Sequence, residues 1–235
     1  MAAEKEMDQH DTPGTGAISS EAGIGPPGNN SGTLGKDPDT EARKRRFYQA
    51  AEPLFTRFGY RKTTVEDICH AAGASKRSFY DLFHDKADLF LHMMFAISEK
   101  EVLRWKEKLP AELSPTRKLD SFIELYVSHI ASHPIWRDTF NNPDVLRAMG
   151  AMMGEIYFSP IVLTLGEILG AGIKSGDFRG IDPEKTLWII LSLLDSVFLL
   201  APELYRDQDW ITSRAMVDEV KSFILNGVHG VNHEN

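Results

Sequence analysis

The stretch Thr63–Leu89 reads TTVEDICHAAGASKRSFYDLFHDKADL and decides how the chain folds. Its first half carries apolar residues at the spacing of a helix that buries one face, namely Val65, Ile68, Cys69 and Ala72. Gly73 breaks this pattern, and Ser75 is placed to cap a second helix. The core-facing residues of that second helix are Phe79, Leu82 and Phe83. Two short helices around a glycine turn are therefore predicted, followed by a third helix that Asp85 caps.

The first turn of the second helix carries three polar hydrogen-bond donors, Lys76, Arg77 and Ser78. A short helix with such donors on its exposed N-terminal turn is what reading of the DNA major groove requires. The pattern therefore predicts a helix-turn-helix motif over about residues 64–83 and indicates a DNA-binding protein.

The net charge of the chain, −8, argues against binding to DNA, but the distribution of the charge along the chain favours it. Residues 1–40 hold 2 basic and 7 acidic residues, and residues 91–235 hold 14 basic and 20 acidic residues. Residues 41–90, in contrast, hold 10 basic and 7 acidic residues, a net charge of +3. The positive segment is the one that carries the motif, as binding to phosphate requires.

The composition is that of a soluble globular protein, with 42% hydrophobic and 26% charged residues among 235. The single cysteine, Cys69, excludes an internal disulfide and suits the reducing cytoplasm, where we expect it to be a packing residue. No secretory signal is visible. The longest apolar stretch, Leu187–Ala201, contains Asp195 and is short for a membrane span, so a buried or interface helix is expected there.

The chain divides into three segments by composition and periodicity. Residues 1–40 are rich in Gly, Ser, Pro, Asp and Asn, and we expect a disordered acidic arm. Residues 41–90 are expected to form the DNA-binding domain, whose first helix would have Thr40 at its cap and end at Gly59. Residues 91–230 show only helical periodicity, so the predicted class is all-α, with a larger C-terminal helical domain. The helical stretches expected after the motif cover about 85–108, 115–132, 143–175, 182–201 and 209–226. Within 143–175, Gly154 or Pro160 can break the helix.

The basic cluster Arg43–Arg46 opens the first of these helices, and two interpretations of it remain open. It forms either a solvated helix face or a set of contacts with the DNA backbone.

The N-terminal domain resembles that of the TetR (tetracycline repressor) family of bacterial transcription regulators. The resemblance is detailed over residues 41–90 only, and beyond them it rests on helical layout and length. The matching residues are Phe55, Gly59, Thr64, Ile68, Ala72, Gly73, Ser75, Tyr80, Phe83, Lys86 and Leu89, in the order and spacing of the family.

This resemblance implies which residues contact DNA. Thr64, Tyr80 and Lys86 take positions that meet backbone phosphates in the family. Lys76, Arg77 and Ser78 take positions that meet base edges or nearby phosphates. Arg77 is the best candidate for direct reading, since a guanidinium can grip the O6/N7 edge of guanine.

The resemblance also implies a homodimer that binds a near-palindromic operator, with the last two helices at the interface. The sequence supports this independently, because apolar residues spread around most of the helix that begins near Asp182. The remaining helices would enclose a small-molecule effector. Candidate residues of that pocket are Tyr126, His129, Trp136, Met149, Met153, Tyr157 and Trp188. For each of them, packing in the core is the more common role, since an aromatic or Met stripe at helical spacing is usually core.

Three hypotheses of function follow. The leading one is a cytoplasmic, effector-responsive transcriptional regulator, a repressor released from its operator by a small molecule. The second is a constitutive DNA-binding protein whose C-terminal domain serves only dimerisation or a protein partner. The third is an enzyme, and the sequence offers it little support, because no nucleophile elbow, phosphate loop or paired carboxylates are visible. No metal or cofactor is expected, since His129 and His133 stand four residues apart without an evident third ligand.

Overall fold

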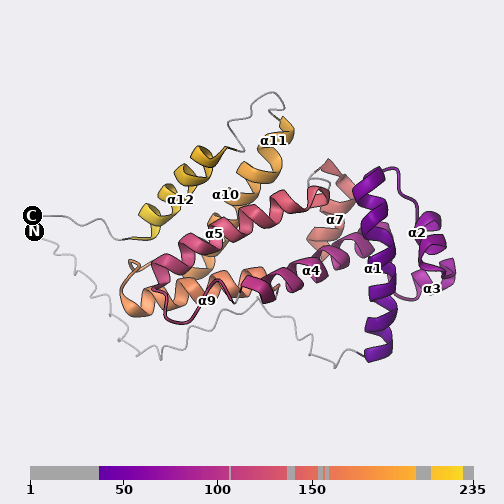
Figure 1. The fold of residues 1–235 in the computed structure, drawn as a ribbon, viewed down its shortest axis with the longest axis horizontal. Helices are drawn as coiled ribbons and strands as arrows, with labels where there is room; N and C mark the ends of the chain where they lie inside the picture. The colour runs from indigo at the N-terminus through magenta and orange to yellow at the C-terminus, as the bar shows by residue number, and fades with distance from the viewer. Residues whose placement is uncertain are drawn as a thin grey trace, which may run out of the picture.

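Helices make up all the regular structure over the residues that the computed structural model describes, which are 37–105, 107–136, 141–152, 156, 159–204 and 213–229. Figure 1 shows three of them, α1 to α3, at one end of an elongated molecule, and α4 leading from there into the larger C-terminal domain. The expected all-α class with a small N-terminal and a larger C-terminal domain is thus confirmed.

The first helix, α1 (Pro38–Phe58), begins earlier than its pattern suggests. Asp37 is its cap: the carboxylate accepts hydrogen bonds from the backbone N–H groups of Asp39 and Thr40, and proline occupies the first helical position. Thr40, expected at the cap, lies inside the helix and donates its hydroxyl to Asp37 at 2.9 Å. The rest of the expected arm, residues 1–36, lies outside the described residues.

Aromatic side chains hold the N-terminal domain together. The ring of Phe47 on α1 meets Phe79 and Phe83 edge-on, at 5.7 and 5.8 Å between centroids. Phe79 belongs to α3 (Lys76–Tyr80), which follows α2 (Val65–Ala72). Edge-to-face packing of fully buried rings fixes orientation as well as distance. The short α3 therefore owes its position to tertiary packing.

The fourth helix, α4 (Lys86–Trp105), takes part in two hydrophobic cores. Leu89, Phe90 and Met93 near its start are buried in the N-terminal core with α1 to α3. Val102 and Trp105 near its end are buried in the C-terminal core. The two domains are therefore joined through one continuous element.

Serine or aspartate followed by proline starts three helices of the C-terminal domain. These are α5 (Pro115–Ser132), α9 (Pro160–Ser175) and α10 (Pro183–Asp195), capped by Ser114, Ser159 and Asp182. The helical stretch expected over 143–175 is divided at Pro160, one of its two expected breaks: Pro160 starts α9, and a separate helix, α7 (Pro143–Ala151), precedes it. Gly154, the other expected break, lies outside the described residues. The remaining elements are η1 (Pro134–Trp136), η2 (Ser196–Leu200), α11 (Ala201–Leu204) and α12 (Arg214–Val228).

The apolar helix expected over 182–201 changes its winding in the middle. After Asp195 the chain forms a π-helical segment, η2, in which the backbone N–H of Ala201 reaches Ser196 O. The carboxylate of Asp195 accepts a hydrogen bond of 2.5 Å from the hydroxyl of Tyr126 on α5. The acid in the apolar stretch is thus paired within the C-terminal domain.

Among the described residues, none of the helices has the length and apolar character needed to cross a membrane.

Gly172 on α9 permits a close contact within the C-terminal core. A Cβ atom built there would lie 2.1 Å from the ring of buried Phe178, whereas at Gly170 on the same helix it would meet nothing within 4 Å. We expect Gly172→Ala to lower the free energy of unfolding by about 1–3 kcal/mol, because the phenyl ring must move. Gly170→Ala is the matched control and should raise it by up to about 1 kcal/mol through helix propensity. Urea titration followed by circular dichroism measures both, and equal effects would contradict this role of Gly172.

Candidate DNA-binding site

A capping box fixes the start of α2. The Thr64 hydroxyl accepts from the backbone N–H of Asp67 at 3.1 Å, and the Asp67 carboxylate accepts from the backbone N–H of Thr64 at 3.0 Å. The Thr64 hydroxyl also donates to that carboxylate, which holds the pKa of Asp67 below its ordinary value. The neighbouring Thr63 is buried, and its hydroxyl donates to Gly59 O at 3.0 Å. Thr64 itself is exposed at the start of α2.

The turn of the motif depends on glycine and on an arginine from α1. Gly73 has φ +56°, the left-handed conformation, and ends α2. Arg46 donates from Nη2 to Gly73 O at 2.8 Å. Arg46, a member of the basic cluster, thus stabilises the turn. Neither interpretation of the cluster, as a solvated helix face or as contacts with the DNA backbone, included this role. Arg43 and Arg45 of the same cluster are exposed.

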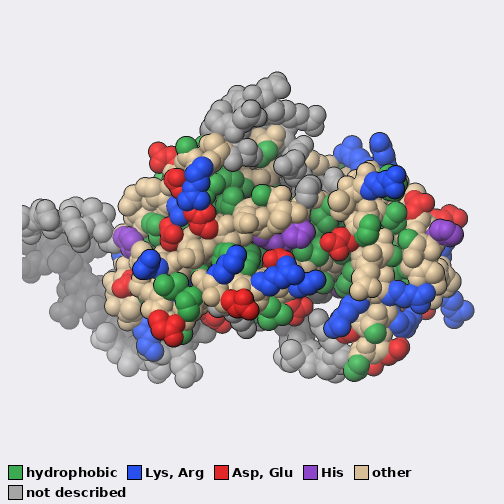
Figure 2. All heavy atoms as spheres, viewed as in Figure 1, with side chains coloured by type: hydrophobic (Ala, Val, Ile, Leu, Met, Phe, Trp, Pro, Cys, Tyr) green, Lys and Arg blue, Asp and Glu red, His purple; other side chains and the backbone are tan. Residues whose placement is uncertain are grey.

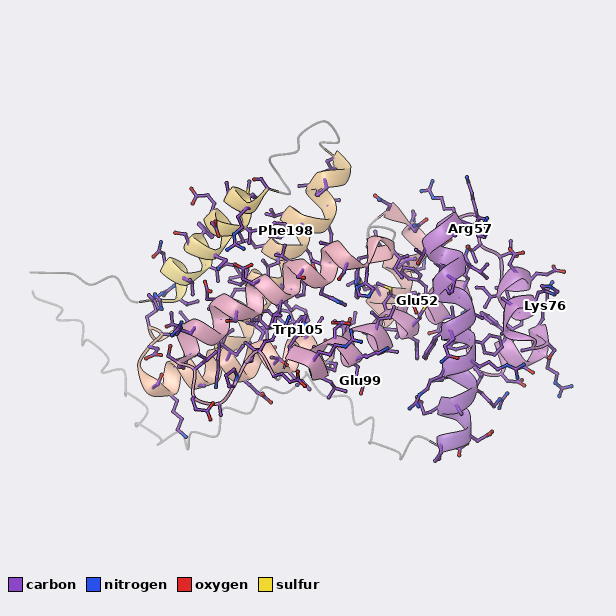
Figure 3. The ribbon with its side chains drawn as sticks, viewed as in Figure 1. Glu52, Arg57, Lys76, Glu99, Trp105 and Phe198 are labelled. Carbon is purple, nitrogen blue, oxygen red and sulfur yellow. The ribbon has the colours of Figure 1, made fainter. Side chains whose placement is uncertain are left out.

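The second helix of the motif presents its polar residues to solvent. Ser75 caps α3 by accepting from the backbone N–H of Ser78 at 3.1 Å. Figure 3 shows Lys76 at the outer end of the molecule, on the side of the motif away from α1. Arg77 is exposed, and Tyr80 is 57% exposed. The structure thus brings Lys76, Arg77 and Tyr80 onto one short, exposed helix.

Lys76 already has a partner in the absence of DNA. Its ammonium pairs with the carboxylate of Glu66 on α2 at 2.9 Å, which raises the pKa of Lys76. Both side chains are more than half exposed, and such pairs contribute little because solvent screens them. A phosphate can therefore replace Glu66 at small cost.

Lys86, at the start of α4, differs from the other candidate contacts. Its ammonium donates to Tyr60 O at 2.7 Å and to Thr63 O at 2.8 Å, and lies 4.1 Å from the centroid of the Tyr60 ring. These contacts tie the connection between α1 and α2 to α4. A phosphate contact by Lys86 remains a prediction. The structural role was not visible in the sequence, because nothing in the spacing shows which carbonyls lie nearby.

A second connection links the N-terminal domain to α7. Arg61, in the loop after α1, donates from Nε to the side chain of Asn142 and from Nη2 to Asn141 O, both at 3.0 Å. Asn142 is only 4% exposed and lies at the cap position of α7. Sequence reasoning missed this pair, which stands 81 residues apart.

The described candidate pocket residues pack in different parts of the structure. Tyr126 and Trp188 pack in the C-terminal core, whereas Met149 packs against the N-terminal core. Trp136 packs against both, and its ring lies 5.3 Å from that of His129. Met153 and Tyr157 lie outside the described residues.

Burial changes the proton affinity of three groups in the C-terminal domain. It lowers the pKa of His129 to about 4, with a smaller contribution from His133. It raises the pKa of Asp195 to about 6, against the hydrogen bond from Tyr126, which by itself lowers it. Burial, followed by the charge of Asp195, also raises the pKa of Tyr126. No group of three His, Cys, Asp or Glu side chains in the described ranges could hold a metal ion.

Comparison with known proteins agrees with the geometry of the motif. The family model described as "Bacterial regulatory proteins, tetR family" matches residues 47–93. The chain is 26% identical over 156 residues to the uncharacterized HTH-type transcriptional regulator YhgD of Bacillus subtilis (strain 168), covering 64% of this chain and 80% of that protein. It is 26% identical over 191 residues to the HTH-type transcriptional repressor KstR2 of Rhodococcus jostii (strain RHA1), covering 79% and 91%.

Among solved structures, the fold is similar to the transcriptional regulator FadR from Bacillus subtilis, crystallised with stearoyl-CoA. The TM-score is 0.58 at 19% sequence identity, and the match covers 79% of this chain and 99% of FadR. At this identity the similarity shows the fold alone.

The contacts of Lys86 predict its contribution to stability. We expect Lys86→Met to lower the free energy of unfolding by about 2 kcal/mol, because two carbonyl groups lose a charged hydrogen-bond donor. Lys62→Met, at an exposed lysine of the preceding loop, is the control and should change it by less than about 0.5 kcal/mol. Guanidinium titration of both variants is the measurement. A Lys86→Met protein as stable as the control would show that these hydrogen bonds contribute nothing.

Proposed function

The N-terminal domain of this chain belongs to the tetR family of bacterial regulatory proteins, and from this premise we propose the activity of the whole protein. It is a sequence-specific transcriptional repressor that binds a near-palindromic operator as a homodimer, in the cytoplasm, and is released by a small-molecule effector. The observation that carries the proposal is the exposed helix α3, held in a capped and packed helix-turn-helix.

The exposed face of the motif supports a direct role in DNA binding. Lys76, Arg77 and Tyr80 are exposed although the helix that carries them is fixed by buried Phe79. Lys and Arg side chains also gather over α1 to α3 in Figure 2, although the whole chain is acidic. In this arrangement α3 enters the major groove, with Arg77 at base edges and Thr64 and Tyr80 at phosphates.

Exposed apolar side chains on α10 and α12 support the dimer. Ile189 on α10 is 64% exposed and Phe223 on α12 is 71% exposed. An open groove of about 710 Å³ lies beside them, lined by Leu193, Glu219, Val220, Ser222, Phe223, Asn226 and Gly227. Large exposed apolar residues beside a groove are the usual sign of an interaction surface. A second copy placed on this surface would form the expected four-helix interface.

The connections between the domains support regulation by an effector. Because α4 lies in both cores and Arg61 joins the loop after α1 to the start of α7, a shift of α4 or α7 must move the N-terminal domain. FadR, which shares the fold, was crystallised with stearoyl-CoA, so this helical layout can hold a small molecule. Two acids, Asp195 and Glu167, stand among apolar residues of the C-terminal domain and are the only ones that could suggest an enzyme. They do not support one, because Asp195 is paired with Tyr126 and Glu167 is exposed.

The role assigned to Arg77 predicts a change in both affinity and specificity. We expect Arg77→Ala to weaken binding to the preferred DNA sequence by about 1–3 kcal/mol and to relax the base preference at one position of each half-site. Arg57→Ala is the control: this arginine lies in the last turn of α1, beside Phe58, and should leave both unchanged. DNA selection followed by fluorescence anisotropy at fixed salt measures the two properties. An unaltered base preference in Arg77→Ala would rule out direct reading by this residue.

The apolar surface predicts how the dimer can be dissociated. We expect Phe223→Asp to convert the protein into a folded monomer. Each copy would bury a carboxylate without a positive partner in the dimer interface, which is costly. Leu103→Asp changes a leucine of α4 that is 60% exposed and should leave the dimer intact. Analytical ultracentrifugation reports the mass, and circular dichroism reports the fold. A dimer that persists in Phe223→Asp would place the interface elsewhere.

A further inference from the structure

Two buried polar atoms near the meeting point of α4, α5 and η1 have no hydrogen-bond partner within the described part of the chain. They are Nδ1 of His129 and Nε1 of Trp136. His129 is only 4% exposed, and the centroids of the two rings lie 5.3 Å apart. Because buried polar groups in proteins nearly always have a partner, two neighbouring exceptions indicate a missing group. None of the described residues supplies that group.

The hydrogen bonds of Ser98 establish which nitrogen of His129 carries the proton. The Ser98 hydroxyl donates its only hydrogen to Met94 O at 3.0 Å. Its contact with His129 Nε2, at 3.5 Å, therefore has the ring nitrogen as donor. Nδ1 is then left as an acceptor, while the indole Nε1 of Trp136 can only donate. One of the two orphaned atoms is thus an acceptor and the other a donor.

The surroundings of this pair favour an uncharged group. Burial lowers the pKa of His129 to about 4, so the ring is neutral at neutral pH. Among the described residues, no lysine or arginine pairs with either His129 or Trp136. An anionic group would be buried here without a compensating cation, which is costly. An ether or ketone oxygen would satisfy Trp136 but leave His129 without a donor.

We propose that this pair binds the hydroxyl group of an uncharged, largely apolar molecule, an inference that rests on the effector role proposed above. The hydroxyl oxygen accepts from Trp136 Nε1, and its hydrogen is donated to His129 Nδ1. The rings of Trp105 and Trp136 flank His129 and provide an apolar aromatic wall.

The two orphaned atoms lie where a bound ligand can affect both domains. Trp136 packs against both hydrophobic cores, and Ser98 lies on α4, the helix that both cores share. A ligand that bonds to Trp136 therefore acts at the junction of the two domains.

The test compares aromatic alcohols with their methyl ethers, using the full-length protein and isothermal titration. The pairs are phenol with anisole and 2-naphthol with 2-methoxynaphthalene. We expect the alcohol of at least one pair to bind about tenfold more tightly, since only the alcohol satisfies both atoms. The ratio of the affinity for the alcohol to that for the ether should fall to about one in Trp136→Phe and in His129→Leu. His229→Leu, the matched loss of an imidazole that packs against Phe178 and has no part in the proposed site, should keep the preference for the alcohol.

Three results would overturn the proposal: equal affinity for alcohol and ether, a preference that survives in both Trp136→Phe and His129→Leu, or no binding of any probe. Addition of the probes to the complex with DNA separates this inference from the proposed function. A preference for alcohols without release of DNA contradicts effector regulation alone. Release of DNA equally by alcohol and ether contradicts the hydroxyl site alone.

Discussion

The structure depends on α4 being shared by two hydrophobic cores. Its first turns bury Leu89, Phe90 and Met93 against the helix-turn-helix domain, and its last turns bury Val102 and Trp105 against the C-terminal domain. Because protein interiors are close-packed, neither core can shift along this helix without disturbing the other. A molecule or a partner chain bound to the C-terminal domain therefore acts on the DNA-binding domain through α4, a continuous helix that is packed in both cores.

The sequence was most informative where structure depends on local chemistry. Gly73 and Ser75 predicted the end of α2 and the start of α3 correctly, because each residue acts on backbone groups within a few positions. The same holds for Pro183 after Asp182, at the start of α10. The end of α3 was predicted wrongly, since Leu82 and Phe83, expected in this helix, follow its last residue Tyr80. Thr40 was a second exception: Asp37 and Pro38 together form a stronger start signal three residues earlier.

Features that depend on distant residues could not be predicted from the sequence. Lys86 bonds to carbonyl groups more than twenty residues away, Arg46 bonds to Gly73 O, and Arg61 bonds to Asn142, so charged residues that suggest DNA contacts also hold the fold. The π-helical segment after Asp195 leaves no trace in the hydrophobic pattern. His129 Nδ1 and Trp136 Nε1 are orphaned because none of the described residues places a hydrogen-bond partner beside them. The periodicity of the sequence cannot show which groups lie near a side chain in the fold.

Selection of bound DNA from a randomised pool, followed by footprinting, tests the central claim most directly. That claim is that α3 of each protomer reads one half of a two-fold symmetric site. The account predicts an inverted repeat whose half-site centres lie about one helical turn, or a multiple of it, apart, with protection on one face of the duplex. Enrichment of a single site without symmetry would contradict the dimer, and the absence of any enriched sequence would contradict the role of α3.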